Sequence, residues 1–282
     1  MRLSISNIAW DVEEDEAVSA LLKRLGLNAV DVAPGKYFPK PEAATEEEIL
    51  RVRRGWSDRG VEVVGMQALL FGTVGLNLFG SDGSRQAMLA HLEAVCRIGG
   101  GLGARWLVFG SPKNRDRSGL RDEQVEAVAL PFFRKLGDVA VAHGVTICLE
   151  PNPSRYGANY MVSSDETAQV VRQVDHPGIQ MQLDTGALAL NGEDPDGVIE
   201  RFSGLVGHVH ASEPDLVPLG DGSSAHGRVA ELLRRHLPEK LVTVEMVATK
   251  NEPHLHAIER ALQIAQRHYG AIVSEGASGI AV

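Results

Sequence analysis

Eight short runs rich in β-branched and other apolar residues recur along the chain, and a longer segment with helical spacing of apolar residues follows each. The runs cover residues 3–10, 27–34, 61–71, 104–112, 145–151, 179–184, 205–210 and 241–247. Regular alternation of strands and helices predicts an α/β fold with parallel strands. At 282 residues, eight such units suit a (β/α)8 barrel, in which a ring of helices surrounds a ring of strands.

A doubly wound open sheet is the alternative, and the alternation within the later runs separates the two folds. In the run at 145–151, Thr146, Cys148 and Glu150 share one face, and apolar residues occupy the other. The same pattern recurs in three further runs, at 179–184, 205–210 and 241–247. The strands of an open parallel sheet are covered on both faces and are usually apolar on both. One consistently polar face therefore favours a closed TIM barrel with a polar interior.

Local signals support this organisation. Thr45 and Glu48 have the spacing of a capping box and predict the start of a helix. Pro131 falls inside a helical segment, where it marks either the start of that helix or a kink. No change in composition suggests a linker, so we expect a single-domain barrel over residues 1–269. A tail rich in small residues, expected to be loose, follows over residues 270–282.

The charge and cysteine content narrow the possible function classes. The chain carries 28 Lys and Arg against 37 Asp and Glu, a formal net charge of −9, which disfavours binding to nucleic acid and to anionic membranes. Cys96 and Cys148 lie far apart in apolar settings and indicate buried thiols in a reducing compartment. The chain starts without the pattern of a signal peptide, and no segment has the length of a membrane span. We therefore expect a cytoplasmic protein.

Four side chains that suit metal binding end the polar faces of the last four runs: Glu150, Asp184, His210 and Glu245. Their spacings are 34, 26 and 35 residues (184−150, 210−184 and 245−210), about one strand and one helix each. Active sites of such barrels lie at the carboxyl ends of the strands, where neighbouring strands would bring the four side chains around one point. Any one of them alone has the alternative of a structural ion pair or a solvated strand end. Their shared phase and spacing favour a joint site.

The chemistry of these four side chains indicates a metal ion. Three carboxylates gathered at one point repel one another unless a cation lies between them. Oxygen ligands with one imidazole suit a single divalent ion, for which we expect Mn²⁺ first, with Mg²⁺, Co²⁺ and Zn²⁺ as alternatives. His208 shares the inward face but lies one layer deeper, where a supporting role, including contact with a substrate, is favoured over ligation.

The segments that contain these residues, LEPNP, LDTGA, GHVHASEPD and VTVEM, resemble the xylose isomerase-like barrels, which include sugar phosphate isomerases/epimerases and ketose 3-epimerases. The resemblance extends over nearly the whole chain, to about Tyr269. It implies a TIM barrel whose four metal ligands fall on Glu150, Asp184, His210 and Glu245. In the epimerase branch it also implies proton transfer by the two glutamates. A homodimer or higher homo-oligomer is a further implication.

Two positions depart from the epimerase pattern. Epimerases commonly have a histidine three residues after the aspartate of the sixth strand, where this chain has Ala187. They also have an arginine after the motif of the seventh strand, where this chain has Leu216. Both family residues contact hydroxyl groups of the substrate. The departures therefore bear on the identity of the substrate and leave the metal ligands intact.

Together these features predict a divalent-metal-dependent isomerase or epimerase that acts on a small sugar or sugar-like polyol through a metal-stabilised enediolate. One glutamate would remove a proton and another would return it. Glu150 and Glu245 are the catalytic candidates, unless both serve only as ligands and the base lies elsewhere. A dehydratase or lyase acting on a keto-polyol would use the same site.

Two other classes are less favoured. A DNA-repair endonuclease on this barrel holds three zinc ions and needs histidines at the ends of the early strands, where the sequence has none. A non-catalytic barrel would show damaged metal ligands, and all four are intact.

Five further residues are expected to bind the substrate: Trp10, Asn152, Tyr156, His208 and Glu213. Trp10 would form an apolar wall, and Asn152 and Tyr156 would bond hydroxyl groups, with packing or turn formation as the alternatives. For Glu213, a solvated loop charge is the alternative. The glycine-rich segment 218–227 follows the seventh run, where many barrels bind phosphate, but it lacks a nearby lysine.

Overall fold

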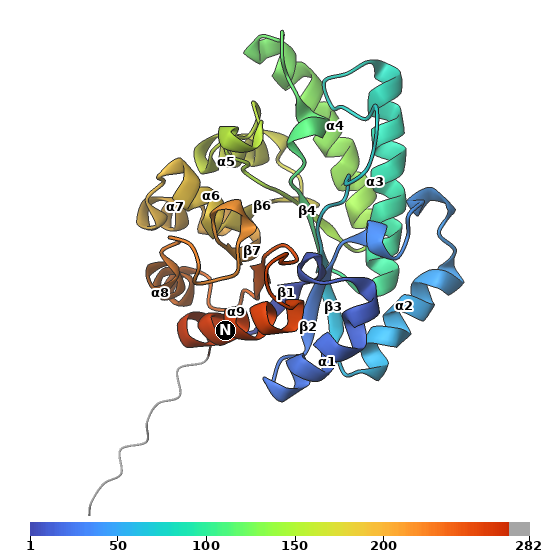
Figure 1. Ribbon diagram of the computed structural model, residues 1–282. Coiled ribbons are helices and arrows are strands. Elements are labelled where there is room, and N and C mark those ends of the chain that lie inside the picture. The colour runs from blue at the N-terminus through green and yellow to red at the C-terminus, as the bar shows by residue number, and fades with distance from the viewer. Residues whose placement is uncertain (271–282) are drawn as a thin grey trace, which may run out of the picture.

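The computed structural model describes residues 1–270. Within that range each strand pairs in parallel with the next one along the chain, and the last pairs with the first, which closes a barrel (Figure 1). The strands are β1 (Leu3–Ser6), β2 (Ala29–Val32), β3 (Glu62–Met66), β4 (Trp106–Phe109), β5 (Thr146–Leu149), β6 (Ile179–Asp184), β7 (Val206–Ser212) and β8 (Val242–Glu245). The predicted single-domain (β/α)8 TIM barrel is confirmed. The predicted tail lies, apart from Gly270, outside the described residues.

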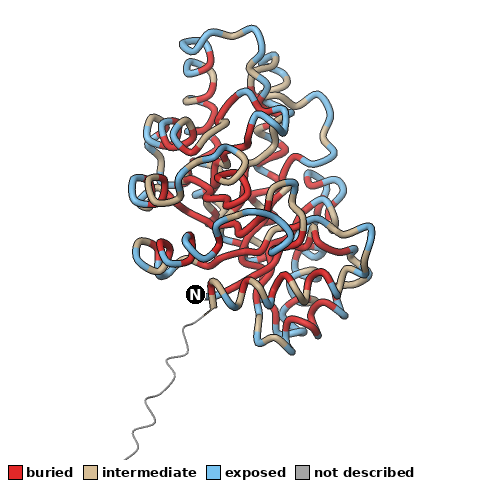
Figure 2. Tube along the Cα trace, turned by 60° about the vertical axis from the view of Figure 1, so that its left-hand side comes forward, coloured by how far each residue is buried: buried red, intermediate tan, exposed pale blue. Residues whose placement is uncertain are grey.

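Helices alternate with the strands and surround the barrel (Figure 1). They are α1 (Asp15–Arg24), α2 (Glu46–Asp58), α3 (Asp82–Leu102), α4 (Asp122–Ala142), α5 (Ser164–Val174), α6 (Thr185–Asn191), α7 (Pro195–Phe202), α8 (His226–His236) and α9 (His254–Tyr269). Figure 2 shows buried chain through the centre of the molecule and exposed chain at its periphery. No helix within residues 1–270 combines the length and the hydropathy needed to cross a lipid bilayer.

The inside of the barrel is polar, as the alternation within the strands predicts. Ser4 and Thr243 are fully buried and share a hydrogen bond of 2.5 Å between their hydroxyl groups. The His208 ring stacks on Trp106 with the ring centroids 5.5 Å apart. Apolar residues between these positions, such as Val209, are equally buried and form the layer under the helices. A polar interior surrounded by an apolar shell places hydrogen-bonding side chains directly below the mouth of the barrel.

Some strands are shorter than the runs that predict them. β3 ends at Met66, although the predicted run extends to residue 71. The chain turns out of the barrel at Ala68, whose φ of +55° lies in the left-handed region that non-glycine residues rarely adopt. The apolar residues that follow therefore belong to a loop at the carboxyl end of the barrel. Their hydrophobicity continued the strand pattern in the sequence, and only the backbone turn ends it.

Helix boundaries follow the local signals with one exception. Thr45 and Glu48 form the predicted reciprocal cap at the start of α2. Gly103 ends α3 with a φ of +89°, a conformation that glycine adopts without steric cost. Helix α4 runs from Asp122 to Ala142 with Pro131 inside it, so the first of the two alternatives, a helix that starts at Pro131, is wrong. Pro131 is exposed, and water can satisfy the carbonyl group that loses its partner there.

Candidate metal centre

The structure brings the four predicted metal ligands to one point at the carboxyl ends of the last four strands. Asp184 ends β6, Glu245 ends β8, His210 lies within β7, and Glu150 follows the last residue of β5. One donor atom from each lies within 4.8 Å of every other. The register of the barrel produces this convergence, because β6 and β7 pair so that Asp184 lies opposite His210. We call Glu150, Asp184, His210 and Glu245 the carboxylate–imidazole cluster.

Electrostatic coupling in the cluster is strong. His210 Nδ1 lies 3.1 Å from Glu245 Oε2 and 3.9 Å from Glu150 Oε1. Burial, together with the charges of Glu245 and Asp184, raises the pKa of Glu150 to about 8. Burial and the charge of Glu245 raise the pKa of Asp184 to about 6. Burial alone would lower the pKa of His210, but the carboxylates, led by Glu245, outweigh it and raise that pKa well above its usual value. A centre that attracts protons this strongly also attracts cations.

Hydrogen bonds from neighbouring groups hold the Glu150 and Glu245 carboxylates in place. Gln67 Nε2 donates to Glu245 Oε1 at 2.8 Å, and Asn152 Nδ2 donates to Glu150 Oε2 at 2.9 Å. Gly110, just after β4, lies so close to Glu150 that a Cβ atom there would stand 1.8 Å from Oε2. Each glutamate thus has one oxygen held by an amide, which leaves the other free to face the centre of the cluster.

Asp184 is held in the same way. Its Oδ1 accepts a 2.6 Å hydrogen bond from the backbone N–H of Ala187, at the start of α6. Its Oδ2 accepts a 2.7 Å hydrogen bond from the hydroxyl group of Ser212, at the end of β7. The N-terminal position on α6 favours a negative charge. The orientation of Asp184 is therefore determined jointly by its own helix and by the neighbouring strand.

Arg115 supports the cluster through Glu150 and Asn152 and was missed by the sequence analysis. It is fully buried and donates to the backbone oxygen of Glu150 at 2.9 Å and to Asn152 Oδ1 at 2.7 Å. Burial lowers its pKa to about 10, against the opposing influence of Glu150. Because it binds both the backbone of Glu150 and the side chain that holds the carboxylate, Arg115 fixes the start of the loop after β5. Its position in an irregular loop gave no periodic signal.

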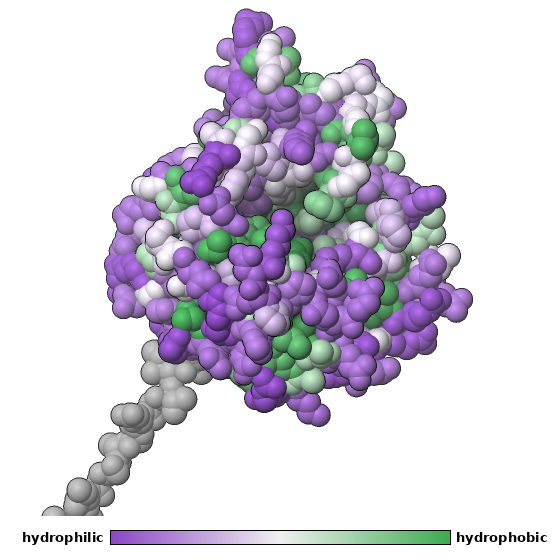
Figure 3. All heavy atoms as spheres, viewed as in Figure 1, coloured by the Kyte–Doolittle hydropathy of each residue, from purple (hydrophilic) through white to green (hydrophobic). Residues whose placement is uncertain are grey.

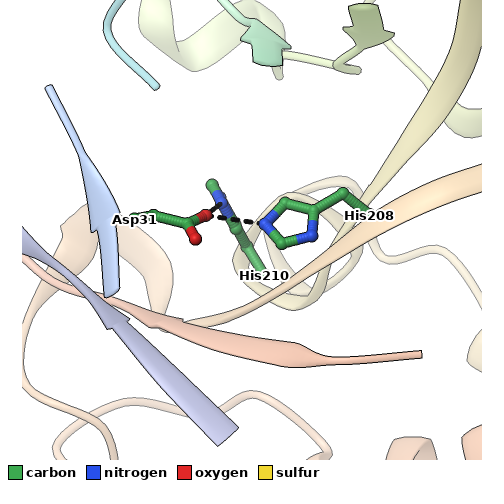
Figure 4. A group of neighbouring side chains, drawn as sticks. All are labelled: Asp31, His208 and His210. Carbon is green, nitrogen blue, oxygen red and sulfur yellow. Dashed lines mark hydrogen bonds and ion pairs between the residues drawn. The ribbon is translucent and has the colours of Figure 1, made fainter. Parts of the chain in front are cut away.

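Asp31 in β2 is a second residue that the sequence analysis missed (Figure 4). Its Oδ2 lies 2.7 Å from His208 Nε2 and 3.6 Å from His210 Nε2. Burial would raise the pKa of Asp31, but the two histidines outweigh it and lower that pKa well below the usual range. Gly65 makes room for this carboxylate, since a Cβ atom there would lie 2.7 Å from it. With Nε2 of His210 facing Asp31, Nδ1 faces the carboxylates of the cluster. A charge in the middle of the apolar run AVDV was the available signal.

Replacing Asp31 by asparagine should weaken metal binding without altering any residue of the cluster. The neutral amide no longer balances the two histidines, so we expect the dissociation constant for Mn²⁺ to rise about 10- to 100-fold. The free energy of unfolding should fall by about 3 kcal/mol. Isothermal titration calorimetry and urea denaturation measure the two effects. Thr243→Val is the matched control, because Thr243 Oγ1 bonds His208 Nε2 at 3.2 Å, and it should change stability without changing affinity. An unchanged Mn²⁺ affinity in Asp31→Asn would contradict the orienting role.

The donor set of the cluster fits a divalent cation. Three carboxylates repel one another in the absence of positive charge, as the raised pKa of Glu150 records, and the three oxygen donors and single nitrogen suit Mn²⁺ and related ions. Another group of potential ligands within residues 1–270 joins Asp11, Glu14 and His254. That group lies near the surface, where the carboxylate of Glu14 is already bonded to the backbone of Asp11 and to His254. Its members therefore satisfy one another.

A cavity of about 530 Å³ opens above the cluster. Asn152, Tyr156 and Glu213 line it, as do the two departures from the epimerase pattern, Ala187 and Leu216. The face shown in Figure 3 is hollowed near the middle of the molecule, where hydrophobic and hydrophilic atoms lie side by side. The pocket thus combines carboxylates at its base with apolar walls.

Trp10 and His208, two of the predicted substrate contacts, lie elsewhere. Trp10 is fully buried, and its indole N–H donates to Asp15 Oδ1 at 2.8 Å. The Trp10 side chain is therefore engaged in packing and in its bond to α1. His208 lies beneath the pocket, between Trp106 and Asp31. Neither residue lines the cavity.

Glu213 is almost completely buried, and three groups of the protein bond its carboxylate. Its carboxylate accepts hydrogen bonds of 2.9 Å from the backbone N–H groups of Gly220 and Ser224, and lies 3.1 Å from His226 Nε2. Burial would raise its pKa, but His226 and the two amides outweigh this and lower the pKa to about 2. Glu213 is therefore no solvated loop charge. Two amides of segment 218–227 that could cradle a phosphate, those of Gly220 and Ser224, are thus occupied by this internal carboxylate.

Comparison with known proteins agrees with this architecture. The family model described as the xylose isomerase-like TIM barrel matches residues 19–268. A D-psicose 3-epimerase from Ruminiclostridium cellulolyticum is 31% identical over 137 residues. That match covers 48% of this chain and 44% of the relative, so it spans less than half the length of the curated protein.

Solved structures share the fold over almost the whole chain. A D-psicose 3-epimerase with D-tagatose from Clostridium cellulolyticum H10 is similar with a TM-score of 0.79 at 18% identity, covering 96% of this chain and 100% of that one. A 3-keto-D-glucoside 4-epimerase from E. coli has a TM-score of 0.75 at 16% identity, covering 93% of this chain and 99% of that one. The family match, the closed barrel and the position of its site lead to one conclusion: the chain belongs to the xylose isomerase-like TIM barrel family.

Proposed function

We propose that this protein is a divalent-metal-dependent isomerase or epimerase of a sugar or sugar-like keto-polyol. The single observation that supports this best is the convergence of Glu150, Asp184, His210 and Glu245 at the base of a pocket at the mouth of the barrel. The likeness in sequence to a D-psicose 3-epimerase, over 137 residues, supports the reaction class. A homodimer or higher homo-oligomer and a cytoplasmic location stay predictions.

In this proposal the cluster holds one divalent ion through its three carboxylates and His210 Nδ1. When bound, that ion supplies Lewis-acid stabilisation of the negative charge that develops on the oxygen atoms of the substrate. Mn²⁺ is the ion we propose, with Mg²⁺, Co²⁺ and Zn²⁺ as alternatives, because the donor set is rich in oxygen. Asp31 keeps His210 oriented, and Ser212 and the amide of Ala187 keep Asp184 oriented.

Glu150 and Glu245 carry the proton transfers in this proposal. They come from β5 and β8, which two other strands separate in the ring, so they can reach a substrate carbon from two directions. Each is held by an amide through one oxygen and keeps the other available. One carboxylate removes the proton beside the substrate carbonyl and gives an enediolate, and the other returns a proton. Return to the same carbon gives an epimer, and return to the neighbouring carbon gives an isomer.

Solvent exchange tests the proposal directly. The Mn²⁺-loaded protein is incubated in D₂O with a panel of ketoses and inososes, and NMR follows deuterium at the carbon beside each carbonyl. Incorporation into recovered substrate or its epimer supports proton transfer, whereas a product that has lost water identifies a dehydratase that shares the first step. If elemental analysis verifies bound metal and no substrate of the panel exchanges deuterium, the proposal is refuted.

Metal affinity should increase with pH. An entering ion has to displace protons from Glu150, whose pKa is raised to about 8, and from Asp184, whose pKa is raised to about 6. His210, whose pKa is also raised, has to lose a proton before Nδ1 can bind the ion. The dissociation constant for Mn²⁺ should therefore be larger at pH 6 than at pH 8, and binding near pH 7 should release about two protons, one from Glu150 and one from His210. Calorimetric titration in two buffers with different ionisation enthalpies counts the released protons. An affinity that stays constant across this range would contradict the coupled cluster.

A further inference from the structure

We propose that the substrate carries an uncharged, flat apolar group, such as the aromatic aglycone of a glycoside, which binds in a groove beside the reaction pocket. The sugar part would then lie over the carboxylate–imidazole cluster. This inference rests on the proposed function and specifies the substrate class of that site. It follows from the charge of the pocket, from the continuity of the pocket with the groove, and from the apolar surface that the groove presents.

The charges that line the reaction pocket are all negative: Glu150, Asp184, Glu213, Asp215 and Glu245. Within the described residues, no lysine or arginine lines this pocket. In segment 218–227, the remaining candidate for an anion site, the backbone amides of Gly220 and Ser224 already bind Glu213. A phosphate or carboxylate group on the substrate would therefore find no lysine or arginine side chain in this pocket to pair with. This lining favours an uncharged sugar.

Two positions of the pocket wall offer no side-chain hydrogen bond to the hydroxyl groups of a free ketose. Ala187 and Leu216 line the pocket where epimerases of the family carry a histidine and an arginine. Asn152 and Tyr156 keep another part of the wall polar. At Ala187 and Leu216 the side chains offer a substrate only apolar contact.

A second cavity of about 790 Å³ provides that apolar contact. It shares Ile8, Ala68, Leu69 and Phe71 with the reaction pocket, so the two are continuous along the loop after β3. Its other walls include the prolines and the phenylalanine of segment 34–41. Rigid proline and aromatic surfaces suit a planar apolar ring. We call this second cavity the aglycone groove.

Most polar groups of the groove are already paired within the protein. Lys36 donates its ammonium hydrogens to the backbone oxygens of Asn7 and Trp10. Glu42 bonds His91 Nδ1 at 2.8 Å, and His91 Nε2 lies 3.0 Å from the backbone oxygen of Leu69. Lys40 is exposed at the groove, where water solvates it. The surface left for a ligand is therefore mainly apolar.

Phe71 stands at the junction between the groove and the pocket. It is 88% exposed, and it is one of the residues that line both cavities. Val247, from the loop after β8, lines the same groove and is also exposed. A planar group seated in the groove would cover both side chains. Val74, in the same loop as Phe71, is 93% exposed but lines neither cavity, and so provides a matched control.

The experiment compares two uncharged substrates that share one sugar, 3-keto-D-glucose and phenyl 3-keto-β-D-glucoside. We expect the Mn²⁺-loaded protein to exchange deuterium into the phenyl glycoside with a kcat/KM at least about tenfold higher than into the free sugar. Phe71→Ala should remove most of that advantage through KM, so that kcat/KM falls much more for the phenyl glycoside than for the free sugar. Val74→Ala should change neither substrate. Both side chains are exposed, so both variants should fold.

Equal kcat/KM values for the two sugars, or a Phe71→Ala variant that weakens both equally, would overturn the inference while leaving the isomerase or epimerase intact. If neither sugar exchanges, the proposed function fails for this sugar, and calorimetric binding then decides the inference separately. A phenyl glycoside that binds the wild-type protein at least about tenfold more tightly than the free sugar, with the difference lost in Phe71→Ala, supports the groove. Equal dissociation constants refute it.

Discussion

Glu150→Gln should reduce solvent deuterium exchange by about 1,000-fold or more, which is the size expected when a positioned acid–base group is removed. The amide keeps the shape of the side chain and can still bond Asn152, whose Nδ2 lies 2.9 Å from Glu150 Oε2. It cannot accept the substrate proton and is a poorer ligand for a cation. NMR detection of label beside the carbonyl measures the loss. Glu239→Gln, at an exposed glutamate on the surface, is the control and should exchange at the wild-type rate.

In metal-free protein, the same variant should be more stable than wild type at high pH. The pKa of Glu150 is raised to about 8 in the folded state, whereas an unfolded glutamate has a pKa of about 4.3. Between these values the folded protein binds more protons than the unfolded protein, so Glu150 lowers stability progressively as the pH rises. Glu150→Gln should therefore melt a few degrees above wild type at pH 8 and lose this advantage below about pH 4. In the exchange experiment, a Glu150→Gln variant that retained the wild-type rate of deuterium exchange would exclude Glu150 from the mechanism.

Removal of the metal should have the second large effect. Chelation should lower exchange to background, and addition of Mn²⁺ should restore it. Binding to the folded state alone, at a free ion concentration 100 times the dissociation constant, stabilises a protein by about 2.7 kcal/mol. For a chain of this size the melting temperature should therefore rise by about 5–10 °C. Differential scanning calorimetry, with and without chelator, measures this shift.

Two carboxylate variants locate the ion that causes the shift. Asp184→Asn should lose the Mn²⁺-induced rise in melting temperature, because Asp184 belongs to the carboxylate–imidazole cluster. Glu14→Gln should keep it, because Glu14 belongs to the separate surface group with Asp11 and His254. A shift that persists in Asp184→Asn and disappears in Glu14→Gln would place the ion at the surface group instead and would contradict the proposed centre.

The fold and the carboxylate–imidazole cluster could be predicted from the sequence because both depend on local periodicity. A two-residue period shows which side chains of a strand share a face, and the spacing of one strand and one helix brings the ends of successive strands to one rim. Glu150, Asp184, His210 and Glu245 each end or nearly end such a phase. The period fixes the face on which each side chain lies, and the register of the barrel then brings these side chains together.

The supporting residues obeyed no such rule. Asp31 bonds His208, which lies 177 residues away along the chain, and no local pattern records which distant strand will face it. Trp10 follows β1 closely, but its side chain is fully buried and bonds Asp15 in α1. Glu213 follows β7, but the loop before α8 folds back and surrounds it with hydrogen bonds. For all three, loop geometry or a distant partner decided the role.

The sequence by itself therefore determined the barrel, its polar interior and the four side chains at its mouth, because strand alternation and the spacing of the units are properties of neighbouring residues. Only the tertiary structure decided what surrounds those side chains. Asp31 faces His210, the buried Arg115 bonds the backbone of Glu150, and an apolar groove lies beside Phe71. Those features arise from closure of the barrel and from the paths of its loops, where residues distant in sequence meet and where hydrogen bonding and packing, rather than periodicity, select the conformation.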